Sequence, residues 1–162
     1  MLSSPVHMPH SIRRRQLMSA WVAAGTLAAT ALLAPLRALA AGKSRGAFEA
    51  NTPLGALRAL GASSPADSRD ILIDVAQVAE NGAVVPIEVS SRIEGTVAIS
   101  LIVDKNPFPL AARFEFFSGA QPFVRASLKL GESSVVRVLA QAAGKSYGAT
   151  REVRVTAGGC GG

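Results

Sequence analysis

The chain has 162 residues and a formal net charge of +6, and 49% of its residues are hydrophobic. This length suits one globular domain with a single core. Its one cysteine excludes an intramolecular disulfide and the cysteine-rich metal centres, such as iron–sulfur clusters.

Residues 1–40 have the features of a signal peptide. Three arginines, Arg13 to Arg15, precede an apolar stretch from Leu17 to Ala34, and Ala38-Leu39-Ala40 supplies a small-x-small cleavage site. The Arg14-Arg15 pair resembles the twin-arginine type of leader, which exports folded proteins. A transmembrane anchor is the alternative, but the stretch is rich in alanine and contains glycine and threonine. We therefore expect a periplasmic protein without a membrane anchor after cleavage.

Cleavage after residue 40 would change the composition of the chain. Both histidines, the only tryptophan and four of the 17 basic residues would leave with the leader, so 13 basic and 11 acidic residues give a net charge of +2. This small charge gives no support to nucleic-acid binding. A chain without histidine cannot form a Ser-His-Asp or Cys-His site or a histidine-ligated metal site. We expect a protein that is not an enzyme and holds no cofactor or metal.

Residues 41–70 are predicted to form an N-terminal segment with a short helix and a linker. Residues 41–50 are expected to be loose. Thr52 is a suitable N-cap, Pro53 suits the first helical position, and Gly61 is a stop signal. Leucines at helical spacing lie between these signals: Leu54, Leu57 and Leu60.

Residues 71–156 are predicted to form an antiparallel β-sandwich, because short strands follow one another without intervening helices. Asn81-Gly82 is a strong turn signal, and Ser118-Gly119, Gly131-Glu132 and Ala143 to Lys145 mark further turns. Pro86 favours an edge strand or a bulge. The predicted strands are Ile71–Val75, Ala83–Ser91, Val97–Val103, Ala111–Phe117, Phe123–Leu130, Val135–Gln141 and Tyr147–Thr156.

Two groups of side chains between residues 67 and 154 allow a functional and a structural interpretation. The acidic group Asp67, Asp70 and Asp74 could bind a metal, but it is better explained by a solvated linker and strand. The run from Arg151 to Arg154 is explained by strand alternation, although its charges could orient a neighbouring segment or bind an anion. Five phenylalanines are expected in the core or at a partner interface: Phe108, Phe114, Phe116, Phe117 and Phe123.

The single cysteine, Cys160, is flanked by Gly158, Gly159, Gly161 and Gly162. Glycines carry no side chains that could shield a thiol, and their backbone freedom makes ordering unfavourable. We therefore predict that residues 157–162 form a flexible carrier arm with Cys160 as the covalent attachment point for a substrate. The five residues from Thr156 to Cys160 can span at most about 17 Å.

Three segments carry a family resemblance: Ala79–Pro86, Lys105–Leu110 and Val153–Gly162. Together they resemble the SoxY-type sulfur carriers of bacterial thiosulfate oxidation. The resemblance implies an immunoglobulin-like sandwich and a heterodimer with a SoxZ-type subunit. It also implies that Cys160 carries thiosulfate-derived sulfur between three transient partners. These would be a SoxAX-type cytochrome, a SoxB-type hydrolase and a SoxCD-type sulfur dehydrogenase.

Two other hypotheses use the same features. One is a structural or adhesive periplasmic module that dimerises through a disulfide between two copies of Cys160. The other is a ubiquitin-like carrier that forms a thiocarboxylate at Gly162. The leader argues against the second, because ATP-dependent activation takes place in the cytosol.

Overall fold

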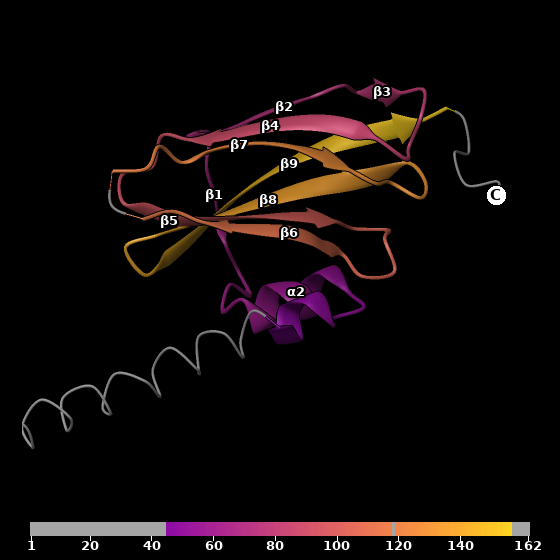
Figure 1. The fold of residues 1–162 in the computed structure, drawn as a ribbon. Coiled ribbons are helices and arrows are strands. Elements are labelled where there is room, and N and C mark those ends of the chain that lie inside the picture. Colours follow the sequence, from indigo (N-terminus) through magenta and orange to yellow (C-terminus); the bar gives the residue numbers. More distant parts are fainter. Residues whose placement is uncertain (1–44, 118, 157–162) are drawn as a thin grey trace, which may run out of the picture. The chain divides into compact units, whose positions relative to one another are not determined.

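The structure, a computed structural model, describes residues 45–117 and 119–156. The predicted leader and the predicted carrier arm lie outside the described residues. In these ranges, nine strands form two sheets that face each other (Figure 1). The predicted all-β sandwich is therefore confirmed. Within the described ranges, no helix is long and apolar enough to cross a membrane.

The larger sheet has the strand order β1-β9-β8-β5-β6, and β3 also pairs with β9. Its long strands are antiparallel, whereas the two-residue strands β1 and β3 run parallel to β9. The bounds of these strands are β1 Ala66–Asp67, β3 Val78–Ala79, β5 Thr96–Val103, β6 Leu110–Glu115, β8 Ser134–Ala142 and β9 Lys145–Val155.

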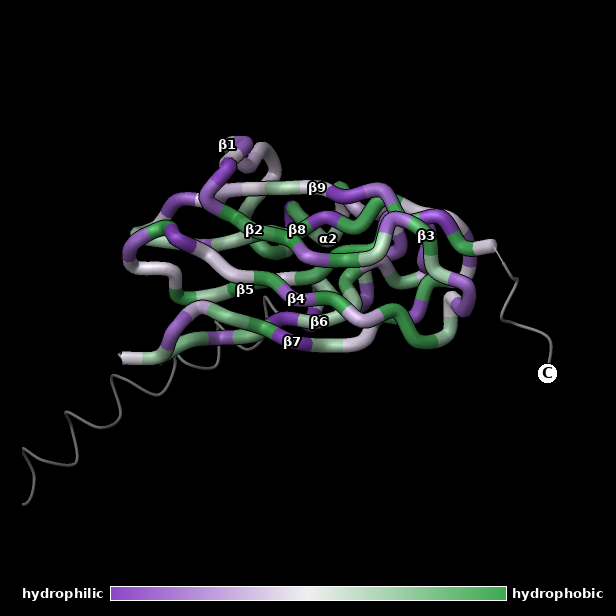
Figure 2. Tube along the Cα trace, turned by 90° about the horizontal axis from the view of Figure 1, so that it is seen from above, coloured by the Kyte–Doolittle hydropathy of each residue, from purple (hydrophilic) through white to green (hydrophobic). Residues whose placement is uncertain are grey.

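The smaller sheet is antiparallel and has the order β2-β4-β7. Its strands are β2 Ile71–Val75, β4 Val85–Ser91 and β7 Phe123–Leu128. Apolar and polar residues alternate along β4, so one face contacts the core and the other faces outward. This alternation is visible as a change of colour from residue to residue along the tube in Figure 2.

The main apolar cluster lies between the two sheets. Both sheets contribute fully buried side chains, among them Val85 and Ile87 from β4, Leu101 from β5 and Val138 from β8. Val153, near the end of β9, is also fully buried in this cluster. The strand that leads to the predicted arm is thus fixed in the core close to its end.

The other face of the larger sheet is covered by helix α2, Pro53–Ala59. Ala56 is fully buried in a second apolar cluster with Ile102 of β5 and Leu139 of β8 (Figure 1). The predicted helix signals are confirmed. The Thr52 hydroxyl accepts a hydrogen bond from the Gly55 N–H at 3.1 Å, and Gly61 follows the helix with a φ of +72°.

One local expectation was wrong and two short strands were missed. Residues 45–48 are helical where a loose segment was predicted, because Ala47 is buried in the same cluster as Ala56 of α2. The short strands β1 and β3 were not predicted, since two residues give no periodicity to read. Pro86 lies in the central strand of its sheet, but only β7 pairs with it, because the β2 pairing ends one residue away, at Ile87 and Val75. Pro86 thus has the edge position that was expected.

Candidate functional site

The last described residues of β9 are hydrogen-bonded on more than one side. The Arg154 N–H donates to the Gln77 carbonyl at 2.8 Å, and the Thr156 N–H donates to the Ala79 carbonyl at 3.1 Å. Between them, the Val155 N–H donates to the Ser133 hydroxyl at 2.9 Å. The backbone from which the predicted arm departs is therefore held in place up to Thr156.

The link between β7 and β8, residues 129–133, joins this region to two further segments. The Leu130 N–H donates to the Gly82 carbonyl at 2.7 Å. The Asn106 side chain donates to the Lys129 carbonyl at 2.8 Å and accepts from the Gly131 N–H at 3.4 Å. Asn106 belongs to the run of residues 105–110, and Gly82 to the run of residues 79–86.

The described parts of the three segments that carry the resemblance thus meet at one end of the sandwich. We call this end the arm end and define it as residues 76–84, 104–109 and 129–133 with Thr156. Figure 1 shows the arrowhead of β9, the strand β3 and the β5–β6 and β7–β8 links together at this end. The sequence did not predict this convergence. Gly131-Glu132 indicated only a turn, and no local pattern showed which other segments this turn would contact.

Gly82 is packed too closely for any side chain. A Cβ atom at this position would lie 2.4 Å from the Leu130 carbonyl oxygen and 3.0 Å from a methyl carbon of Val155. The Asn81 side-chain oxygen accepts a hydrogen bond from the Ala83 N–H at 2.8 Å, which confirms the predicted turn. Gly82 lets this turn lie directly against the end of β9.

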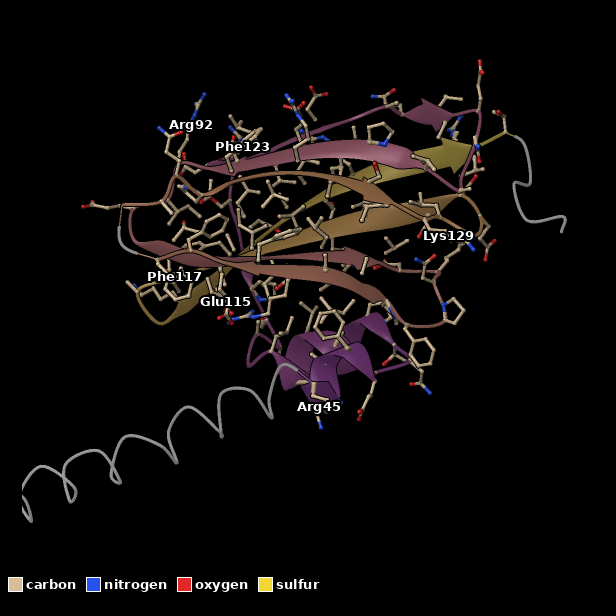
Figure 3. All side chains as sticks on the ribbon, viewed as in Figure 1. Arg45, Arg92, Glu115, Phe117, Phe123 and Lys129 are labelled. Atoms are coloured by element: carbon tan, nitrogen blue, oxygen red, sulfur yellow. The ribbon has the colours of Figure 1, made fainter. Side chains whose placement is uncertain are left out.

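Exposed apolar side chains gather at both ends of the sandwich. At the arm end, Val78, Val84 and Phe108 are 54%, 58% and 61% exposed. At the opposite end, Val97 and Phe117 line a hollow with Arg92. Figure 3 shows Phe117, Phe123 and Arg92 at that end and Lys129 at the arm end. Of the five phenylalanines singled out above, Phe114 and Phe116 pack against the core.

Charged side chains of β9 lie beside the arm end. Arg151, Glu152 and Arg154 are exposed and line a hollow with Gln77 and Val78. Among the described residues, none of these three charged groups forms an ion pair within 4.0 Å. The run from Arg151 to Arg154 therefore lies on the surface, except for the buried Val153.

An ion pair joins β8 to the residue that follows β5. Arg137 of β8 donates two hydrogen bonds to Asp104, at 2.7 and 2.8 Å. These hydrogen bonds raise the pKa of Arg137, against the opposing effect of its partial burial. A raised pKa means that the contribution of Arg137 to stability is lost only as the pH rises through that value. The pair is therefore unaffected by deprotonation of Arg137 near neutral pH.

The predicted site residues Cys160, Gly158, Gly159, Gly161 and Gly162 lie outside the described residues. The acidic group considered as a metal site is placed by the structure on β1, before β2 and on β2. Across residues 45–117 and 119–156, no three histidine, cysteine, aspartate or glutamate side chains are arranged to hold a metal ion. The structure describes the chain up to Thr156, the residue from which the predicted arm departs.

Comparison with known proteins identifies the family. The model of the sulfur oxidation protein SoxY matches residues 57–160. The chain belongs to the SoxY family. The solved structure of the sulfur carrier protein SoxY from Chlorobium limicola f thiosulfatophilum is 35% identical, with a TM-score of 0.60. The similarity covers 69% of this chain and 98% of that chain.

A superoxide reductase (neelaredoxin) from Ignicoccus hospitalis is 21% identical over 52% of this chain and 78% of that chain, with a TM-score of 0.47. This similarity carries no functional argument. A comparison with curated protein sequences finds no match. Family membership makes this chain a sulfur carrier protein of sulfur oxidation, and it implies partners from the Sox system such as SoxZ.

Proposed function

We propose that this SoxY-family protein carries thiosulfate-derived sulfur on the thiol of Cys160 in the periplasm. The observation that carries the proposal is the family match, which extends through the C-terminal region to Cys160 itself. Cys160 is also the only cysteine of the chain, so it is the one thiol that could form the attachment.

The described residues support a division of roles between a rigid body and an attachment segment. Thr156 is hydrogen-bonded to Ala79, and Val153 is buried in the core. Cys160 follows Thr156 by four residues, and the four glycines around it have no side chains to obstruct access to the thiol. The sulfur atom would then be presented to other proteins while the sandwich stays unchanged.

The chemistry requires partners, because the residues after position 40 include no histidine to act as a base. A SoxAX-type cytochrome would couple the Cys160 thiol to thiosulfate. The product is Sγ–S–SO₃⁻, the thiol proton is released, and two electrons pass to the cytochrome. A SoxB-type hydrolase would then add water, releasing sulfate and two protons and leaving Sγ–S⁻. A SoxCD-type sulfur dehydrogenase would oxidise the remaining sulfane sulfur with three water molecules to Sγ–SO₃⁻, releasing six protons and accepting six electrons.

Export and assembly fit the same proposal. The twin-arginine-type leader of residues 1–40 would carry the folded protein to the periplasm. A SoxZ-type subunit without its own leader could cross with it as a folded heterodimer. Because the route accepts folded cargo, one leader would serve both subunits.

The test is intact-mass measurement of the heterodimer after incubation with thiosulfate and the SoxAX-type cytochrome. We expect a mass increase equal to S₂O₃ on the wild-type chain and none on Cys160→Ser. A wild-type chain that never gains sulfur would overturn the proposal. An obligate disulfide dimer whose Cys160→Ser variant loses only assembly would favour the structural alternative instead.

A further inference from the structure

The distance between the folded body and Cys160 is limited by chain length. Five residues from Thr156 to Cys160 reach at most about 17 Å, whatever their conformation. Thr156 is itself fixed to β3 by its hydrogen bond to Ala79. A catalyst that acts on the Cys160 sulfur must therefore bring its reacting groups within that distance of the arm end.

This limit has a consequence for the surface around Thr156. Reacting groups of enzymes lie in clefts, below the surrounding protein surface. When part of the predicted arm extends into such a cleft, less of its length remains outside. The rim of the cleft must then contact the arm end. We infer that the exposed apolar side chains Val78, Val84 and Phe108 are the docking surface for the SoxAX-type cytochrome that loads Cys160 with sulfur. This inference rests on the proposed function.

The three side chains are presented by fixed backbone. Val78 lies in β3. The carbonyl groups on either side of it, those of Gln77 and Ala79, accept hydrogen bonds from the Arg154 and Thr156 N–H groups. Val84 lies between the packed turn at Gly82 and the fully buried Val85. Phe108 follows Asn106, whose side chain is hydrogen-bonded to the β7–β8 link. A rigid apolar surface loses little conformational entropy on docking.

The position of these residues also explains why they are apolar. The Cys160 sulfur is reactive while it is being loaded, so the contact around the cleft should exclude water and other thiols. Apolar side chains gain by leaving water and have no polar groups to satisfy. The catalyst is thus expected to have an apolar rim around the entrance to its active site.

The experiment compares aspartate substitutions at the two ends of the sandwich. Val78→Asp and Val84→Asp change the proposed docking surface, and Val97→Asp is the matched control. Val97 is 54% exposed, as is Val78, but it lies at the opposite end. Each heterodimer is incubated with thiosulfate and the SoxAX-type cytochrome, and kcat/KM for loading is measured by mass spectrometry. Val84→Ser is a milder variant, and circular dichroism checks the fold.

A second reaction isolates the chemistry of the thiol. Tetrathionate loads a thiol without a catalyst, because the thiolate attacks a central sulfur, forms Sγ–S–SO₃⁻ and displaces thiosulfate. We expect Val78→Asp and Val84→Asp to lower kcat/KM for the cytochrome roughly tenfold. Neither variant should change the rate with tetrathionate, and Val97→Asp should change neither rate.

The outcomes separate this inference from the proposed function. Absence of wild-type loading would contradict the proposed function. Normal wild-type loading with equal kcat/KM for Val84→Asp and Val97→Asp would overturn the docking surface alone. Loss of the SoxZ-type subunit from Val78→Asp and Val84→Asp would also overturn it, because the patch would then be the subunit interface. A slower tetrathionate reaction would assign the effect to the thiol instead of to docking.

Discussion

Gly82 is the residue whose size matters most at the arm end. A Cβ atom there would meet the Leu130 carbonyl oxygen at 2.4 Å, and this oxygen belongs to backbone held on both sides of the contact. The φ angle of Gly82 is not in the left-handed region, so the requirement is for space alone. A methyl group would separate the Asn81-Gly82 turn from the end of β9.

The first prediction follows from this contact. Gly82→Ala should lower the free energy of unfolding by about 1–3 kcal/mol, because the added methyl must displace backbone. Gly131→Ala is the matched control, since a Cβ at Gly131 would meet nothing within 4 Å. Urea unfolding, followed by circular dichroism, measures the free energy of unfolding of both variants. Equal effects of the two substitutions would contradict this account of Gly82.

At the scale of elements, the turn between β8 and β9 contains backbone strain. Ala143 has a φ of +48° and Gly144 a φ of +75°. Two successive left-handed residues are typical of the tight hairpin turn that suits the twist of paired strands. Alanine is a poor choice for the first of them, because its Cβ crowds the backbone in this conformation.

The second prediction is that Ala143→Asn stabilises the hairpin. Asparagine tolerates the left-handed region, so the free energy of unfolding should rise by roughly 0.5–1 kcal/mol. Ala143→Val should lower it, because a β-branched side chain fits this region worst. Thermal unfolding of the two variants beside the wild type shows which substitution stabilises the protein and which destabilises it. A stabilising valine would refute the role assigned to the turn.

The seven long strands and α2 were predictable because their signals are local. Alternating apolar residues, the Thr52 cap and the Asn81-Gly82 turn each act within a few neighbouring residues. The edge position of Pro86 was predictable from its missing N–H, but which neighbouring strand stops before it was not, because this depends on strand order. β5 was predicted from an almost continuous apolar run, and the structure explains the run by burial on both faces.

At the scale of the molecule, both apolar clusters lie within residues 47–153. The last backbone hydrogen bond of the described chain is made by Thr156. Among the residues that the structure describes, the buried apolar side chains thus all precede the predicted arm.

The third prediction is that deletion of residues 157–162 leaves the fold intact. The melting temperature and the circular dichroism spectrum of the shortened protein should match those of the wild type, while loading with sulfur is lost. Differential scanning calorimetry beside the mass assay measures both properties. A substantially lower melting temperature would mean that these residues contribute to the core.

The identity of the candidate attachment residue came from composition, since Cys160 is the only thiol of the chain. The surroundings of the arm were not predictable in the same way. Gly82, Asn106 and Ser133 are distant in sequence, and only the folded sheets bring them to one end. Their contacts depend on strand order, which single-sequence patterns do not determine.

The course of β9 affects how the protein withstands a pull on its C-terminal end. β9 has eleven residues, is paired with β8 along most of this length and is flanked by β1 and β3 on the other edge. Hydrogen bonds in an antiparallel pair are perpendicular to the strands, so a force along β9 strains many of them in shear at once. A pull applied through Thr156 is therefore resisted by many hydrogen bonds of β9 at the same time.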